Sequence, residues 1–319
     1  MAGPVTQYRT FAVPVAGGML HGGVWEPDRP DLTEPETGPT PTVLAVHGIT
    51  ASHLAWQWLA DALPGIRIVA PDLRGRGRSG DLPGPTGMAR HAEDLAALIA
   101  AAGGPFGAAP GPVPVVGHSM GGFVATALTA HRPDLVASLL LVDGGLPFPL
   151  PPETTVAQAI DATLGPAAER LTRTFPSREA YQAFWRDHPA FAGHRDDPRL
   201  LAFFDHDLDG VEPDLRPSCR PETMLRDAAD LYRSPEQTAV LDAVVRAAVP
   251  VLFLRAPRDL LDRAGGLYPP ELVPALAEAL PGLDVREVDH TNHYTVVMTD
   301  AGATAVAEAL RGQIGLRTG

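Results

Sequence analysis

Short apolar runs alternate with helix-periodic segments along most of the chain, and this order constrains the fold most strongly. Apolar runs occupy residues 42–48, 67–73, 113–119, 136–144, 249–256 and 283–289, and helical periods occupy 54–63, 88–102, 120–131, 237–248, 270–280 and 301–314. Strands alternating with helices of this length indicate a mainly parallel sheet covered by helices on both faces. Before this pattern, Gly17-Gly18 predicts a hairpin between residues 11–15 and 19–25, and the proline-rich, acidic residues 26–40 predict a surface loop.

The alternation stops near residue 145 and resumes near residue 236. Residues 146–235 show helical patches without a clear buried strand, so we expect a core in two parts, 1–145 and 236–319, interrupted by a mostly helical insert. Nine of the nineteen aromatic residues fall in this insert. Tyr181, Phe184 and Trp185 share one helical face. Most of these aromatics must attach the insert to the core, and Phe184 and Trp185 are candidates to line an apolar pocket.

Composition narrows the function classes. A chain of 319 residues, 45% of them hydrophobic, suffices for one large domain with an inserted lobe. No apolar run approaches the length of a membrane span, and the first residues lack the features of a secretory signal. Cys219 is the single cysteine, which excludes an internal disulfide and favours a cytoplasmic location.

Charge excludes further classes. The net charge of −13, without a basic run, disfavours nucleic acid as a partner. The chain contains no lysine, which excludes Schiff-base catalysis, a pyridoxal-binding lysine and a P-loop.

The stretch GHSMGG, residues 117–122, follows a predicted buried strand and opens a predicted helix. Ser119 stands between Gly117 and Gly121, where a sharp strand-to-helix turn requires small neighbours. Such a turn exposes the hydroxyl at the carboxyl edge of the sheet, near a helix N-terminus. We therefore predict a nucleophile elbow.

A serine hydroxyl needs a base and a group that orients the base. With the nucleophile on this turn, the acid and then the histidine should follow in the chain. His293 lies beyond the last predicted strand and is the expected base, since His290 follows that strand too closely. Asp259, three residues after the run 249–256, is the expected acid, with Asp143 and Asp262 as alternatives.

Two backbone N–H groups should form an oxyanion hole. One belongs to Met120, the residue after the nucleophile, and the other is assigned to Ile49 in the loop after the first predicted parallel strand.

Together these motifs resemble the α/β-hydrolase fold superfamily. The stretches that carry the resemblance are HGITASHLAW (47–56), PDLRGRGRSG (71–80), GHSMGG (117–122), LVDG (141–144), PVLFLRAPRD (250–259) and NHYT (292–295). The resemblance implies that the insert follows the sixth strand as a cap over the active site. A serine at the elbow separates this chain from epoxide hydrolases and haloalkane dehalogenases, which carry aspartate there. The LVDG and NHYT stretches resemble small esterases, thioesterases and lactone-opening hydrolases.

The resemblance implies a cofactor-free serine hydrolase that forms an acyl-enzyme. The expected partner is a small-molecule substrate, a carboxylic ester, thioester or lactone with an apolar group. Two alternatives remain open at this stage: a carbon–carbon bond hydrolase or acyl cyclase that uses the same triad, and a ligand-binding receptor of the same fold.

Five further residues are expected to line the pocket, to pack or to fix a loop. His53 and Trp56 could either line the pocket or pack their helix against the sheet; His118 is expected to pack under the elbow, and Asp72 and Arg74 to fix a loop. Three motif-like stretches carry no site. GRGRSG (75–80) does not open a helix, DHDLDG (205–210) has arginine where a calcium loop needs glutamate, and HTNH (290–293) lacks further metal ligands.

Overall fold

The computed structural model describes residues 7–27, 40–107, 111–148, 150, 153–232 and 234–315. Most of the loop expected at residues 26–40 lies outside these ranges.

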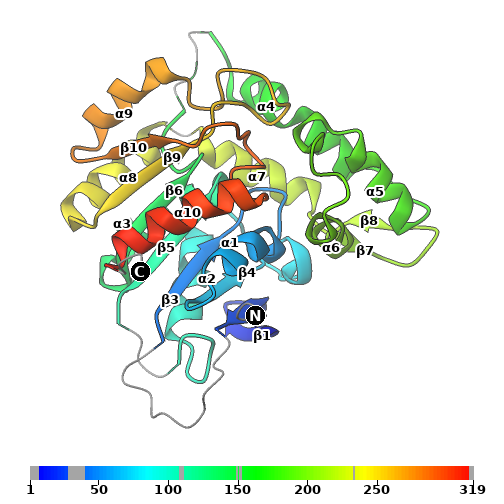
Figure 1. Cartoon of the computed structure of the whole chain (residues 1–319), viewed down its shortest axis with the longest axis horizontal. Coiled ribbons are helices and arrows are strands. Elements are labelled where there is room, and N and C mark those ends of the chain that lie inside the picture. Colours follow the sequence, from blue (N-terminus) through cyan, green and yellow to red (C-terminus); the bar gives the residue numbers. More distant parts are fainter. Residues whose placement is uncertain are drawn as a thin grey trace, which may run out of the picture.

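An eight-stranded sheet forms the centre of the molecule, in the order β1-β2-β4-β3-β5-β6-β9-β10 (Figure 1). Its strands are β1 (Gln7–Val15), β2 (Gly18–Glu26), β3 (Thr42–Val46), β4 (Arg67–Pro71), β5 (Val113–His118), β6 (Val136–Val142), β9 (Val251–Arg255) and β10 (Asp284–Glu287). The strands from β4 to β10 in this order pair in parallel, while β1 and β2 form the expected antiparallel hairpin at one edge. The predicted mainly parallel sheet is confirmed.

Helices cover both faces of this sheet (Figure 1). They are α1 (Gln57–Ala62), α2 (Met88–Ala100), α3 (Met120–His131), α4 (Val156–Leu171), α5 (Arg178–Arg186), α6 (Pro198–His206), α7 (Pro221–Leu231), α8 (Ser234–Ala247), α9 (Val273–Ala279) and α10 (Asp300–Gln313). Side chains of α2, α3, α8 and α9 enter one core layer, and those of α1 and α10 enter the other. Along β3, Leu44 and Val46 face the first layer and Val43 and Ala45 the second. Burial on both faces explains why the strands read as continuous apolar runs.

Helices α4 to α7 lie between β6 and α8 in the chain, as the helical insert expected after the sixth strand. They include a two-stranded piece, β7 (Leu208–Asp209) with β8 (Arg216–Pro217), that the sequence pattern did not predict. Figure 1 shows α4, α5 and α6 together beyond one end of the sheet. Within the described residues, no helix has both the length and the apolar character that crossing a bilayer requires.

Candidate active site

Ser119 lies between β5 and α3 with φ 55° and ψ −125°. This backbone conformation is unusual for a residue with a side chain and is typical of strained functional turns. The neighbouring glycines are sterically required: a Cβ on Gly117 would lie 2.3 Å from the carbonyl oxygen of Gly121, and a Cβ on Gly121 would lie 2.1 Å from that of Val46. The turn at Ser119 therefore has the geometry that the Gly-x-Ser-x-Gly pattern predicts.

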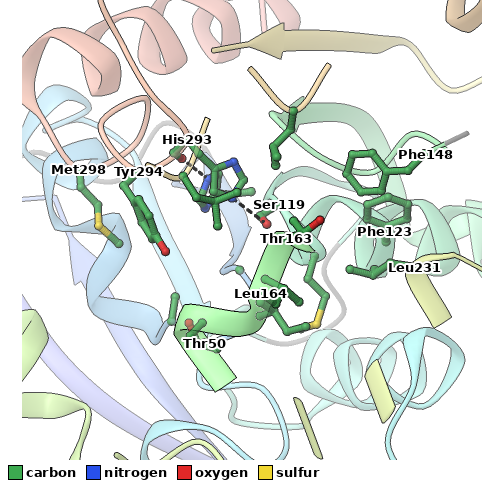
Figure 2. A pocket seen from close by; sticks show the side chains of 18 of the residues that line it. Thr50, Ser119, Phe123, Phe148, Thr163, Leu164, Leu231, His293, Tyr294 and Met298 are labelled. Carbon is green, nitrogen blue, oxygen red and sulfur yellow. Dashed lines mark hydrogen bonds between the residues drawn. The ribbon is translucent and has the colours of Figure 1, made fainter. Parts of the chain in front are cut away.

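His293 lies in the segment between β10 and α10 and faces Ser119 (Figure 2). Its Nε2 is 3.0 Å from Ser119 Oγ. The buried His118 donates from Nε2 to the backbone carbonyl of His293 at 2.7 Å. Burial, and then the neighbouring His293, hold the pKa of His118 well below its usual value, so His118 is neutral and helps to fix this segment.

The acid beside His293 is Asp143 rather than Asp259. His293 Nδ1 lies 2.7 Å from Asp143 Oδ2, and the other oxygen of this fully buried carboxylate accepts a hydrogen bond from the backbone N–H of Ala256 at 3.1 Å. The predicted contact between Asp259 and His293 is wrong. Asp259 accepts from the backbone N–H groups of Leu261 and Arg263, and from the Arg263 side chain at 2.8 Å.

Strand order explains this correction. Strands β5 and β6 are direct neighbours, with His118 opposite Val142, so the next residue of each strand, Ser119 and Asp143, ends at the same level of the sheet. Strand β9, which precedes Asp259, is one strand farther from the nucleophile. The other alternative acid, Asp262, is hydrogen-bonded to Arg258 and does not reach His293. The sequence did contain a signal for this acid: Asp143 comes directly after β6, the strand that follows α3 in the chain.

The turn after β6 is itself strained and touches the elbow. Asp143 has φ 46°, and a Cβ on Gly144 would lie 2.2 Å from the carbonyl oxygen of Ser119. Only glycine at position 144 therefore allows the two turns to approach this closely.

The residues assigned to the oxyanion hole, Ile49 and Met120, line the same cavity as Ser119. The carbonyl oxygen of Gly48 is bonded to His47 Nδ1 at 2.7 Å and to the N–H of Ala51 at 3.2 Å. Because a trans peptide directs its N–H opposite to its carbonyl, these bonds turn the Ile49 N–H away from His47 and Ala51.

His47, which the sequence motifs did not single out, fixes the orientation of the Gly48–Ile49 peptide. Its Nε2 accepts from the backbone N–H of Leu73 at 3.0 Å, so the ring proton is on Nδ1, which donates to Gly48. Burial lowers the pKa of His47 to about 3, so the neutral ring keeps these two bonds at neutral pH.

The cavity above Ser119 is about 820 Å³ with its open mouth included, and its walls are mainly apolar. The core supplies Phe123, and the insert supplies Thr163 and Leu164 of α4 and Leu231 of α7 (Figure 2). A second cavity, about 700 Å³ with its open mouth included, shares six lining residues with the first: Thr163, Ala167, Trp185, Leu260, Leu267 and Tyr294.

The four possible substrate-binding residues divide into two pairs. Trp185 lines both cavities and Phe184 lines the second. His53 and Trp56 line neither, which corrects their assignment as candidates: Trp56 is fully buried in the second core layer, and His53 Nδ1 is bonded to Asp72 at 2.8 Å. Of the two alternatives that the sequence left open for these residues, the structure shows packing of their helical turn against the sheet.

Among the described residues, one group of side chains has the spacing to hold a metal: His53, Asp72 and His206. Direct hydrogen bonds already join its members: the Asp72 carboxylate accepts from His53 Nδ1 at 2.8 Å and from His206 Nε2 at 3.1 Å. Since His206 ends α6 of the insert and Asp72 follows β4 of the core, we interpret the group as a tether between insert and core.

Comparison with known proteins fits this geometry. The model of the alpha/beta hydrolase family matches residues 43–309. The chain belongs to this family. It is 29% identical to 2-(acetamidomethylene)succinate hydrolase of Mesorhizobium japonicum over 81% of this chain and 84% of that protein. It is also 43% identical to lipase LipV of Mycobacterium tuberculosis, over 38% of this chain and 43% of that protein, so the chain spans less than half of LipV.

Solved structures show the same fold. That of E-2-(acetamidomethylene)succinate hydrolase superposes with a TM-score of 0.71 at 21% identity, covering 97% of this chain and 100% of that one. A thioesterase domain from the curacin biosynthetic pathway gives 0.68 at 23% identity, covering 95% and 99%. The implied α/β-hydrolase fold is thereby confirmed.

Proposed function

We propose that this protein is a cofactor-free serine hydrolase that cleaves a carboxylic ester, thioester or lactone. The observation that carries the proposal is the hydrogen-bonded series from Ser119 Oγ through His293 to the buried Asp143, at 3.0 and 2.7 Å. A serine, histidine and carboxylate in this order form the general arrangement for activating a hydroxyl.

In the proposed mechanism, Ser119 Oγ attacks the substrate carbonyl while His293 Nε2 accepts the serine proton. Asp143 stabilises the imidazolium through Nδ1. The developing oxyanion accepts from the N–H groups of Ile49 and Met120. His293 then protonates the leaving group, and a water molecule that His293 deprotonates releases the acyl group from Ser119.

The walls of the first cavity support a substrate with an apolar group, since most of its lining is aliphatic or aromatic. We propose that the insert acts as a cap, because residues of α4, α5 and α7 complete the cavity over Ser119. The names of the relatives, a lipase, a thioesterase domain and a hydrolase, agree with acyl transfer to water. A small-molecule substrate and a cytoplasmic location remain predictions.

The test is a panel of p-nitrophenyl esters, thioesters and lactones with wild type and Ser119→Ala. We expect Ser119→Ala to lower kcat by several orders of magnitude and wild type to show an acyl adduct by mass spectrometry. Ser138→Ala is the matched control, because Ser138 is buried in β6 away from both cavities.

Turnover retained in a folded Ser119→Ala variant would refute the serine mechanism. Tight binding of these compounds by wild type without turnover would favour the receptor alternative. Turnover of a diketone, or cyclisation of a hydroxyacyl chain, in place of ester hydrolysis would favour the carbon–carbon hydrolase or cyclase alternative.

A further inference from the structure

Arg170, in the last turn of α4, is 1% exposed and lines the second cavity. Its Nη1 donates to Asp207 Oδ2 at 2.5 Å and to the hydroxyl oxygen of Tyr181. The guanidinium carbon lies 5.0 Å from the ring centroid of Trp185. One corner of the guanidinium is thus held in place by the insert.

The opposite edge of this guanidinium is unused. Arg170 Nε and Nη2 have no hydrogen-bond partner among the described residues, although both atoms are buried. Buried donors of a charged group are rarely left unpaired, because the lost hydration is costly. A second buried arginine shows what this edge binds: Nε and Nη2 of Arg74 donate to the two oxygens of Asp94, at 2.9 and 2.8 Å. The Nε–Nη2 edge of arginine is a two-pronged donor that matches a carboxylate.

The charge of Arg170 influences the protonation of His188, another residue that lines the second cavity. Burial, and then this charge, lower the pKa of His188, which lines the cavity and is therefore neutral at pH 7. The other charged residues of the cavity, Asp259 and Arg263, are paired with each other at 2.7 Å. Asp259 is thus paired with Arg263 rather than with Arg170.

We propose that the second cavity is a carboxylate subsite in which the Nε–Nη2 edge of Arg170 binds an acid group of the substrate, remote from the carbonyl at Ser119. The two cavities lie side by side, because they share six lining residues, and in this proposal one molecule extends from the first into the second. The reactive group would lie at Ser119, an apolar spacer against Trp185 and Tyr294, and the acid at Arg170. This inference rests on the proposed hydrolase function and narrows its substrate class to acyl groups that end in a carboxylate.

The test compares mono-p-nitrophenyl esters of succinate, glutarate, adipate and suberate with the same compounds carrying a methyl ester in place of the acid. Charge-assisted bonds of this kind predict a kcat/KM ratio of acid to methyl ester of roughly tenfold to a hundredfold at the best chain length. In Arg170→Gln this ratio should fall toward one. In Arg170→Lys it should fall partly, since the charge remains and the two-pronged edge is lost. Arg186→Gln, exposed at the end of α5 and outside both cavities, is the control and should keep the wild-type ratio.

A second measurement covers the case in which Arg170→Gln fails to fold, since Arg170 also holds Asp207. Adipate should competitively inhibit turnover of the methyl-ester substrate by wild type, and dimethyl adipate should inhibit far less. Equal kcat/KM for acid and methyl ester at every chain length, or a preference unchanged in a folded Arg170→Gln, would overturn the subsite.

The two proposals fail in different ways. If wild type hydrolyses no ester, the proposed function fails, and the subsite is then judged from thermal shift. Stabilisation by adipate that exceeds that by dimethyl adipate supports the subsite, and equal shifts refute it.

Discussion

Replacing Asp143 by asparagine tests which carboxylate orients His293. Asp143 is fully buried, and its two oxygens accept from His293 Nδ1 at 2.7 Å and from the Ala256 N–H at 3.1 Å. An asparagine has only one acceptor oxygen. If that oxygen keeps the bond to Ala256, the NH₂ group faces His293 Nδ1, which can pair with it only as an acceptor. The ring proton then lies on Nε2, and His293 cannot take the proton of Ser119.

The expected loss in kcat is about 10⁴-fold, the size that a wrong imidazole tautomer produces in a serine triad. This corresponds to about 5.4 kcal/mol of transition-state stabilisation. The stability cost should be smaller, about 1.5–3 kcal/mol, because the side chain keeps its volume and loses mainly charge-assisted hydrogen bonds. The variant should therefore be folded at 25 °C and inactive.

The assay is kcat and KM on one p-nitrophenyl ester, with Tm measured on the same samples. Asp259→Asn is the matched control, because its carboxylate is bonded to Arg263 rather than to His293; it should keep kcat within a few-fold. If Asp259→Asn is the more damaging change, or if Asp143→Asn keeps a substantial fraction of wild-type kcat, the assignment from the structure is refuted.

Two further predictions concern packing and acid stability. Gly144→Ala should lower kcat/KM by at least about 10²-fold, because the added Cβ displaces the Ser119 backbone. Gly312→Ala is the control and should leave kcat/KM unchanged, since its Cβ would meet nothing within 4 Å. Equal activity of the two variants would contradict the steric argument. Burial alone would raise the pKa of Asp227, but the charge of Arg76 and a hydrogen bond from His91 outweigh it and hold that pKa well below its ordinary value. The stabilisation from Asp227 is therefore complete above an unfolded-state pKa of about 3.9 and is lost as pH falls toward the lower folded-state value. Asp227→Asn should cost about 3–5 kcal/mol at neutral pH by leaving Arg76 buried without its partner, and should flatten the fall of unfolding free energy with acid in urea titrations; an unchanged acid slope would contradict this.

The sheet and the elbow were predictable because their signals are local. Apolar runs on buried parallel strands, separated by helical periods, leave few other folds. At the elbow, close backbone contacts dictate the glycines on both sides of Ser119. His293 was also predictable, since its place after the last strand follows from chain order.

The acid was not predictable, because the choice depends on which strands are neighbours and at which level they end. Asp143 and Asp259 both follow strands that could end near the nucleophile. Only the register that sets His118 opposite Val142 makes Asp143 level with Ser119. His53 and Trp56 failed for a related reason: a helical turn shows which residues share a face, but not whether that face meets the sheet or the cavity.

The position of the acid also changes what the segment after β9 can do. If Asp259 oriented His293, that segment would be committed to the triad. With Asp143 in that role, Asp259 instead pairs with Arg263, and both line the second cavity together with Leu260. The segment therefore contributes to the cavity that Arg170 of α4 also lines. In the proposed mechanism the nucleophile and the acid lie in the two touching turns after β5 and β6, and the base lies in the segment after β10. The proposed carboxylate subsite lies apart from them, between the insert and the segment after β9.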